Sequence, residues 1–345
     1  MYRINTLRRL ALAGMLLAFC VVVFGAFVRL TDAGLGCPDW PGCYGHVTPA
    51  AAAAADAGTA AAPLHVGKAW REMIHRYAAS TLGLIILVIA GCALRWRRHS
   101  GVPLGLPLAL VLLVIFQGML GMWTVTLLLK PLIVTLHLAF GLTTLSLLWW
   151  LWLSLRRRSS GPWAGNVSAA GGGLTSALVR PAPVGVRRAA SIGLIALALQ
   201  IMLGGWTSTN YSAVACPDFP KCQASWWPEA DFKDAFVLWR GLGVNYEGGV
   251  LQQQARVAIH FTHRLGAIVA TLALLFAGIA ALRARHEIHT RWAAVALLLA
   301  LALQLTLGIT MVLRGFPLWL ATAHNAGAAL LLLSALALNR ALRRV

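Results

Sequence analysis

The chain has 345 residues, of which 59% are hydrophobic and 11% are charged, and its mean hydropathy is +0.74. Apolar runs of about 20 residues recur along it, and each can cross a bilayer core of roughly 30 Å, so a multispanning membrane protein is predicted. The net charge of +19 does not indicate a nucleic-acid partner, because the arginines are divided among several loops instead of forming one patch with aromatic residues.

Eight apolar runs follow one another along the chain, at about 9–30, 69–94, 103–128, 132–155, 189–208, 255–282, 292–313 and 318–338. Their even number places both termini on one side of the membrane. Eighteen of the 29 basic residues fall on that side, whereas nine of the ten acidic residues fall on the other. The positive-inside rule therefore predicts cytoplasmic N- and C-termini in the cell (plasma or inner) membrane, with lipid around an all-α integral membrane protein.

The loop after the first run contains CPDWPGC (37–43), and CPDFPKC (216–222) repeats it in the second half of the chain. MIHR at 73–76 and FTHR at 261–264 repeat at nearly the same offset, as do LHLAFG and AHNAGA around His137 and His324. The sequence therefore predicts two tandem, parallel four-helix repeats. Their expected bounds are 1–155 and 189–345.

Residues 156–188 join the repeats and contain an arginine cluster followed by SSGPWAGNVSAAGGGLTS. This composition predicts a flexible cytoplasmic linker without a fold of its own. The alanine-rich stretch at 50–62 predicts no particular element.

Both cysteine pairs fall on the outer side, where disulfides are stable. Five residues separate the two cysteines in each pair, which favours the disulfides Cys37–Cys43 and Cys216–Cys222. Zinc is the alternative, but it prefers four ligands, and only His46 lies near the first pair. Whether the disulfides are structural or redox-active stays open, and the other two cysteines of the chain, within the apolar runs, are expected to be buried.

Four histidines lie at similar depth in the runs that cross from outside to inside. They are His75, His137, His263 and His324. Each is expected about 10 Å below the outer surface, because a helix rises 1.5 Å per residue. Two imidazoles at equal depth on neighbouring helices can bind one heme iron, so each repeat is predicted to form one bis-histidine heme site near the outer face.

The two repeats differ one helical turn before the first histidine, where Glu72 stands in one and His260 in the other. A carboxylate beside a heme edge can accept a proton or stabilise a positive charge, but Glu72 could also simply pair with an arginine. Arg76 and Arg264 follow the first histidine of each pair. They could approach heme propionates or extend to the membrane interface.

The pattern Q-x-x-x-G recurs in three of the runs, at Gln117/Gly121, Gln200/Gly204 and Gln304/Gly308. The glycines would permit close approach of helices, so a packing role is favoured.

Taken together, the eight spans, E-x-x-H-R at 72–76, the later histidines and one cysteine loop per repeat resemble heme A synthase. The resemblance covers the whole chain outside the linker, although the tryptophans at 226 and 227 have no counterpart in it. It implies oxidation of a ring methyl group of heme O to a formyl group, which gives heme A for terminal oxidases and cytochrome oxidase assembly. Heme O would be the substrate, supplied by heme O synthase.

The resemblance also implies a role for each site residue. His75 and His137 would bind the substrate heme O, His263 and His324 would bind a permanent heme b cofactor, and Glu72 would be catalytic. Cys37 and Cys43 would be the pair with a suspected redox role. The electron acceptor and the oligomeric state, a homo-oligomer included, stay open.

Two other functions remain as alternatives. A diheme membrane electron-transfer cytochrome would explain the four histidines but not Glu72 or the cysteine loops. A membrane thiol oxidoreductase linked to quinone would explain the cysteine loops but not four histidines at one depth.

Overall fold

The computed structural model describes residues 2–58, 63–99, 102–159, 182–284 and 288–343. Within these ranges it contains ten α-helices and one 3-10 turn, and β pairing is limited to two isolated bridges. Eight of these helices are long and apolar enough to span a membrane. The prediction of an all-α, multi-pass membrane protein is confirmed.

The eight long helices coincide with the eight apolar runs, and most of them extend a few residues beyond the predicted ends. They are α1 (Tyr2–Leu30), α3 (Val66–Arg95), α4 (Gly105–Thr126), α5 (Pro131–Ser159), α6 (Val184–Thr209), α8 (Gln253–Arg283), α9 (Ile288–Leu313) and α10 (Leu318–Leu342). Between them lie the short helices α2 (Pro49–Ala54) and α7 (Phe232–Ala235) and the 3-10 turn η3 (Ala213–Ala215).

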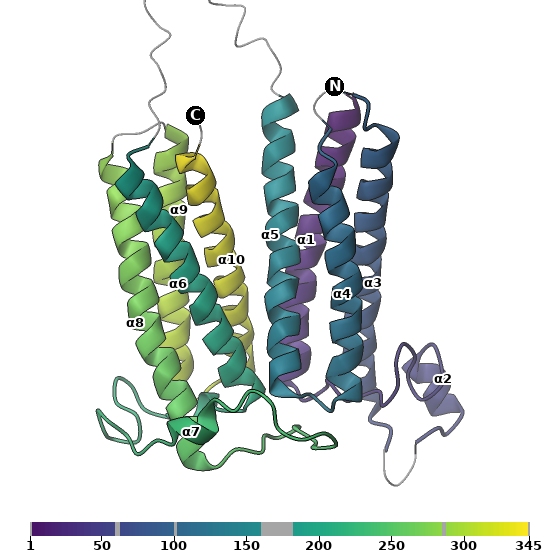
Figure 1. Cartoon of the computed structure of the whole chain (residues 1–345). Helices are drawn as coiled ribbons and strands as arrows, with labels where there is room; N and C mark the ends of the chain where they lie inside the picture. Colours follow the sequence, from purple (N-terminus) through teal and green to yellow (C-terminus); the bar gives the residue numbers. More distant parts are fainter. Residues whose placement is uncertain (1, 59–62, 100–101, 160–181, 285–287, 344–345) are drawn as a thin grey trace, which may run out of the picture.

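The long helices form two groups of four that stand side by side (Figure 1). In the first half α1 and α4 each contact α3 and α5, and in the second half α6 and α9 each contact α8 and α10. The halves meet where α1 and α5 contact α10 and where α5 contacts α6. This arrangement agrees with two tandem four-helix repeats. The start of α1 and the end of α10 lie on the same side, opposite α2 and α7.

The packed core fills the part of the helices away from the cysteine loops and continues from one half into the other. In α1 the core residues are Leu7, Ala11, Met15 and Ala18, and the same cluster includes Leu148 of α5 and Leu338 of α10. Large apolar side chains also cover the outside of the helices, as at Leu112, which is 70% exposed. Such a surface suits a lipid environment, because lipid solvates apolar groups.

A segment of the second half lies across the first half on the side of the cysteine loops. We call residues 236–251 the outer strap (Figure 1). The ammonium group of Lys130 donates hydrogen bonds to the carbonyl oxygens of Arg240 and Gly241, at 2.7 and 2.9 Å, and lies 3.7 Å from the centroid of the Trp239 ring. The backbone N–H of Tyr246 donates to the carbonyl oxygen of Leu128 at 3.1 Å.

Of the predicted linker 156–188, residues 160–181 lie outside the described residues, while α5 ends at Ser159 and α6 begins at Val184. Two other sequence-based expectations differ from the structure. The beginning of the alanine-rich stretch lies in α2 (Pro49–Ala54), where the Thr48 side chain accepts a hydrogen bond from the Ala51 N–H. The prediction that the two remaining cysteines are buried is wrong, since Cys20 is exposed on the outside of α1 and Cys92 is half-buried.

Candidate functional site

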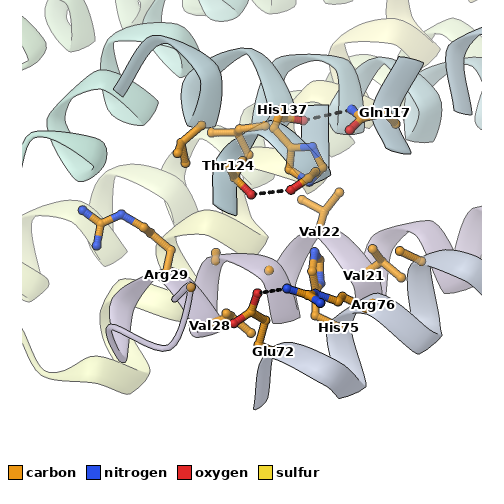
Figure 2. Close-up of a pocket in the computed structure, with 18 of the residues that line it drawn as sticks. Val21, Val22, Val28, Arg29, Glu72, His75, Arg76, Gln117, Thr124 and His137 are labelled. Atoms are coloured by element: carbon orange, nitrogen blue, oxygen red, sulfur yellow. Dashed lines mark hydrogen bonds and ion pairs between the residues drawn. The ribbon is translucent and has the colours of Figure 1, made fainter. Parts of the chain in front are cut away.

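The four depth-matched histidines lie near the cysteine-loop ends of α3, α5, α8 and α10. In the first half, His75 and His137 enter one cavity of about 580 Å³ (Figure 2). Their ring centroids are 6.5 Å apart and their planes are inclined by 75°. Two imidazoles on opposite sides of one iron have centroids roughly 6 Å apart, because metal–nitrogen bonds are about 2 Å long. The pair therefore fits a bis-histidine heme.

The second half places His263 on α8 and His324 on α10, at places that match His75 and His137. All four histidines are partly buried. Within the described part of the chain, the Nδ1 atoms of His75, His137 and His324 are buried and have no hydrogen-bond partner. Such orphaned ring nitrogens are uncommon in apolar surroundings and support a role in binding.

Each of the four rings packs against a glycine of a neighbouring helix. A Cβ atom on that glycine would lie 2.7 Å from the ring Cε1 atom at Gly25, 3.4 Å at Gly121, 3.1 Å at Gly204 and 2.9 Å at Gly308. These glycines face His75, His137, His263 and His324 respectively. The glycines of Q-x-x-x-G do have a packing role, but each accommodates an imidazole ring and not, as expected, the backbone of a neighbouring helix. Gly25 has the same role without a preceding glutamine.

The three glutamines of this pattern contact the same histidines in different ways. Gln117 donates only to the backbone carbonyl of His137, at 2.9 Å. The amide nitrogen of Gln200 lies 3.0 Å from Nδ1 of His263 and 2.9 Å from its carbonyl oxygen. The amide nitrogen of Gln304 lies 3.2 Å from Nε2 of His324.

Glu72 forms part of the cavity wall and is 5% exposed. One carboxylate oxygen accepts a hydrogen bond from the Cys37 N–H at 2.9 Å, and the other pairs with the Arg76 guanidinium at 2.5 Å. The arginine pairing considered from the sequence is therefore present. With this ion pair formed, Glu72 still lines the cavity, so a carboxylate held by two contacts lies beside the first histidine pair (Figure 2).

Both arginines that follow the histidines bind the cysteine loops. Arg76 donates to the carbonyl oxygens of Asp39 and Gly42, at 3.0 and 2.6 Å. Arg264 donates to those of Lys221 and Cys216, at 2.7 and 2.8 Å. Each arginine thus anchors a cysteine loop to the adjacent end of its helix. This is a third possibility besides the two considered from the sequence.

His260 occupies the place of Glu72 in the second half. Its Nε2 atom accepts a hydrogen bond from Arg264 at 3.2 Å, as Glu72 accepts one from Arg76. The histidine therefore keeps the contact with the arginine but brings no fixed negative charge to the second half.

The two cysteine loops have the same internal structure. Their disulfides, Cys37–Cys43 and Cys216–Cys222, are confirmed, so these sulfurs are not free to bind zinc. The acidic residue of each motif caps the loop. Asp39 accepts hydrogen bonds from the N–H groups of Tyr44 and Gly45, and Asp218 accepts them from Gln223 and Ala224.

The charge of Asp39 also affects its neighbour. Burial, together with the negative charges of Asp39 and Glu72, raises the pKa of Tyr44 above its ordinary value. The Tyr44 hydroxyl therefore stays neutral at physiological pH, and it donates a hydrogen bond to the carbonyl oxygen of Pro63 at 3.1 Å.

Several cavity residues were not predicted as site residues, because they come from the other half or from the end of α1. The second half contributes Gly205, Ser208, Thr209 and Asn325 to the wall of the first-half cavity. Arg29, also in this wall, donates to the carbonyl oxygen of Ser208 at 2.8 Å, and its guanidinium lies 4.0 Å from the centroid of the Tyr211 ring. The first-half site is thus completed by the second repeat.

Comparison with known proteins gives consistent matches over this whole architecture. The chain is 42% identical over 325 residues to the heme A synthase of Shewanella oneidensis, covering 92% of this chain and 91% of that protein. It is 30% identical over 343 residues to the heme A synthase of Paracoccus denitrificans, covering 89% and 80% of the two chains. Identity to the heme A synthase of Halalkalibacterium halodurans is 25% over 310 residues, covering 88% and 86%.

A family model described as cytochrome oxidase assembly protein, COX15-CtaA, matches residues 8–336. This range includes both histidine pairs, both cysteine loops, six of the eight long helices in full, and all but the first residues of α1 and the last residues of α10. The chain therefore belongs to the COX15-CtaA family of cytochrome oxidase assembly proteins.

Proposed function

We propose that the chain is a heme A synthase, which oxidises a ring methyl group of heme O to a formyl group and so produces heme A for terminal oxidases. The observation that carries this proposal is the pair His75 and His137, which face each other across a cavity at a centroid distance of 6.5 Å. Family membership and the 42% identity to a heme A synthase support it.

The two halves have different tasks in this proposal. The first half, 1–155, binds heme O through His75 and His137, and the second half, 189–345, holds a permanent heme b through His263 and His324. The linker region 156–188 connects them. A bound heme b supplies one-electron redox chemistry to the reaction. The difference between Glu72 and His260 supports this division, because it gives only the first half a carboxylate at its histidine pair.

Glu72 is the proposed catalytic residue. Its carboxylate is held from two directions, by the Cys37 N–H and by Arg76, so its position at the cavity wall is fixed before substrate arrives. There it can accept a proton from the methyl group being oxidised or stabilise positive charge at the adjacent ring carbon.

The proposal places the chain in the cell membrane with both termini in the cytoplasm and both histidine pairs toward the outer face. The distribution of basic residues supports this orientation. Heme O synthase is the proposed supplier of the substrate. The electron acceptor and the assembly into homo-oligomers can be determined on the same purified protein.

The decisive experiment expresses the chain in a bacterium that makes heme O but lacks its own heme A synthase. Hemes are extracted from the membranes and separated by chromatography, with the His137→Ala variant as control. Heme A should appear with the wild-type chain and be absent with the variant. If the wild-type protein accumulates in the membrane with two bound hemes but no heme A forms, the diheme electron-transfer cytochrome becomes the better explanation.

A further inference from the structure

The two halves differ in what contacts the first histidine of each pair. Gly204 on α6 faces His263, and Gly25 on α1 faces His75, so these glycines occupy equivalent places in the two repeats. One helical turn before them stand Gln200 and Val21 respectively. The second half therefore has an amide at a position where the first half has an apolar side chain.

In the second half, the amide of Gln200 reaches the ring of His263. Its nitrogen lies 3.0 Å from Nδ1 and donates to the His263 carbonyl oxygen at 2.9 Å, while its oxygen Oε1 is buried without a partner among the described residues. A Cβ atom on Gly266 would collide with this amide, so the glycine one turn after His263 makes room for it. The corresponding residue after His75 is Ala78.

In the first half, the Nδ1 atom of His75 is buried and has no hydrogen-bond partner in the described part of the chain. Val21 lines the same cavity but cannot form a hydrogen bond (Figure 2). Gln117 approaches His137 only at its backbone carbonyl. No amide therefore contacts a ring nitrogen of the first pair within the residues that the structure describes.

This difference affects how firmly a metal ligand is held. When Nε2 of a histidine binds iron, Nδ1 carries a proton and needs an acceptor. When the Gln200 amide rotates by 180°, Oε1 takes the place of the nitrogen that lies 3.0 Å from Nδ1 and accepts this proton, in exchange for the hydrogen bond to the His263 carbonyl oxygen. This contact fixes the ring orientation and makes Nε2 a stronger donor. The amide of Gln304 likewise lies 3.2 Å from a ring nitrogen of His324, here Nε2, so both histidines of the second half have an amide neighbour.

We propose that Gln200 is a positioning residue that holds His263 as a ligand of the permanent heme, and that Val21 in the equivalent place leaves His75 less firmly held, so that the first half releases its heme. The proposal rests on the proposed function, since it explains how two repeats with similar histidine pairs come to keep a cofactor in one half and exchange a substrate in the other.

The test measures transfer of heme b from the purified full-length protein to an excess of apomyoglobin, together with the reduction potential of the bound heme. In Gln200→Leu, heme b should dissociate about 10- to 100-fold faster than in the wild type, and its potential should rise because the ligand is a weaker donor. Gln117→Leu is the matched control. It also loses a glutamine hydrogen bond between helices, but it should leave heme b dissociation and potential unchanged.

A reciprocal variant keeps the proposal testable if Gln200→Leu does not fold. Val21→Gln combined with Ala78→Gly introduces the amide and its space into the first half, and should slow the release of heme O from that half. The positioning role would be overturned if Gln200→Leu kept the wild-type rate of heme b dissociation and the wild-type reduction potential, or if Gln117→Leu changed both equally. Neither result would contradict the proposed function, as long as the wild type still forms heme A. Purified wild type without heme b would overturn the proposed function as well.

Discussion

Replacing Gly25 by alanine should displace His75, the proposed ligand of the substrate heme, without a substitution at His75 itself. The new Cβ atom would lie 2.7 Å from Cε1 of His75, whereas ordinary contacts begin at about 3.4 Å, so the ring or the helix has to move by about 0.7 Å. Overpacking of this kind costs about 1–3 kcal/mol. If the bound state bears this cost, the affinity for heme O should fall about 5- to 150-fold.

The assay is an absorbance titration of the purified protein with heme O, accompanied by thermal unfolding and by the amount of bound heme b. Gly91→Ala is the matched control, because Gly91 lies in α3, the helix of His75, and a Cβ atom there would meet nothing within 4 Å. It should bind heme O normally and be slightly more stable, since alanine favours helices more than glycine does. Gly121→Ala, with its 3.4 Å contact to His137, should give a smaller loss than Gly25→Ala.

The reasoning fails if Gly25→Ala binds heme O as tightly as the wild type, because His75 would then have room that the 2.7 Å contact denies it. It also fails if heme b is lost to the same extent as heme O affinity. That result would mean that the substitution disturbs the whole protein and not the first-half site.

Three further predictions concern the ligands, the cysteines and the carboxylate. His263→Ala should lower the bound heme b, whereas His75→Ala should spare it and abolish conversion of heme O; equal losses of extracted heme b would contradict the division between the halves. Replacing Cys37 and Cys43 by serine should lower the free energy of unfolding by about 2 kcal/mol and leave turnover per folded molecule intact, and impaired turnover in well-folded protein would instead indicate a redox role. Glu72→Gln should fold, keep heme b and bind heme O, but convert it about 100-fold more slowly or worse; an ordinary rate of heme A formation would limit Glu72 to supporting the cysteine loop.

The features that the sequence predicts well depend on local chemistry or on repetition. Hydropathy places the eight helices to within a few residues, because burial in lipid requires an uninterrupted apolar run. The cysteine pairs follow from their spacing and from the repeated motif. Equal depth predicts that His75 and His137 lie at one level, but α3 and α5 stand diagonally across their group of four and are not neighbours, so the 6.5 Å separation of the rings requires the structure.

The features that the sequence does not predict depend on which helix faces which. The contact of Gly25 with His75 joins α1 and α3, and no motif around Gly25 marks it, because Val21 replaces the expected glutamine. The targets of Arg76 and Arg264 are backbone carbonyls, which carry no signature in the sequence. Lys130 could not be assigned to the outer strap either, since the two segments are more than 100 residues apart.

The local construction of the cysteine loops has a consequence for biosynthesis. The disulfide, the aspartate cap and the paired backbone hydrogen bonds between Cys43 and His46 all lie within residues 37–46. Each loop can therefore close soon after it has crossed the membrane in the proposed orientation, before the following helix is inserted. Four cysteines allow three pairings, and early closure selects the native one because Cys37 and Cys43 meet long before Cys216 is synthesised. Correct oxidation of this membrane protein should thus proceed without a disulfide isomerase.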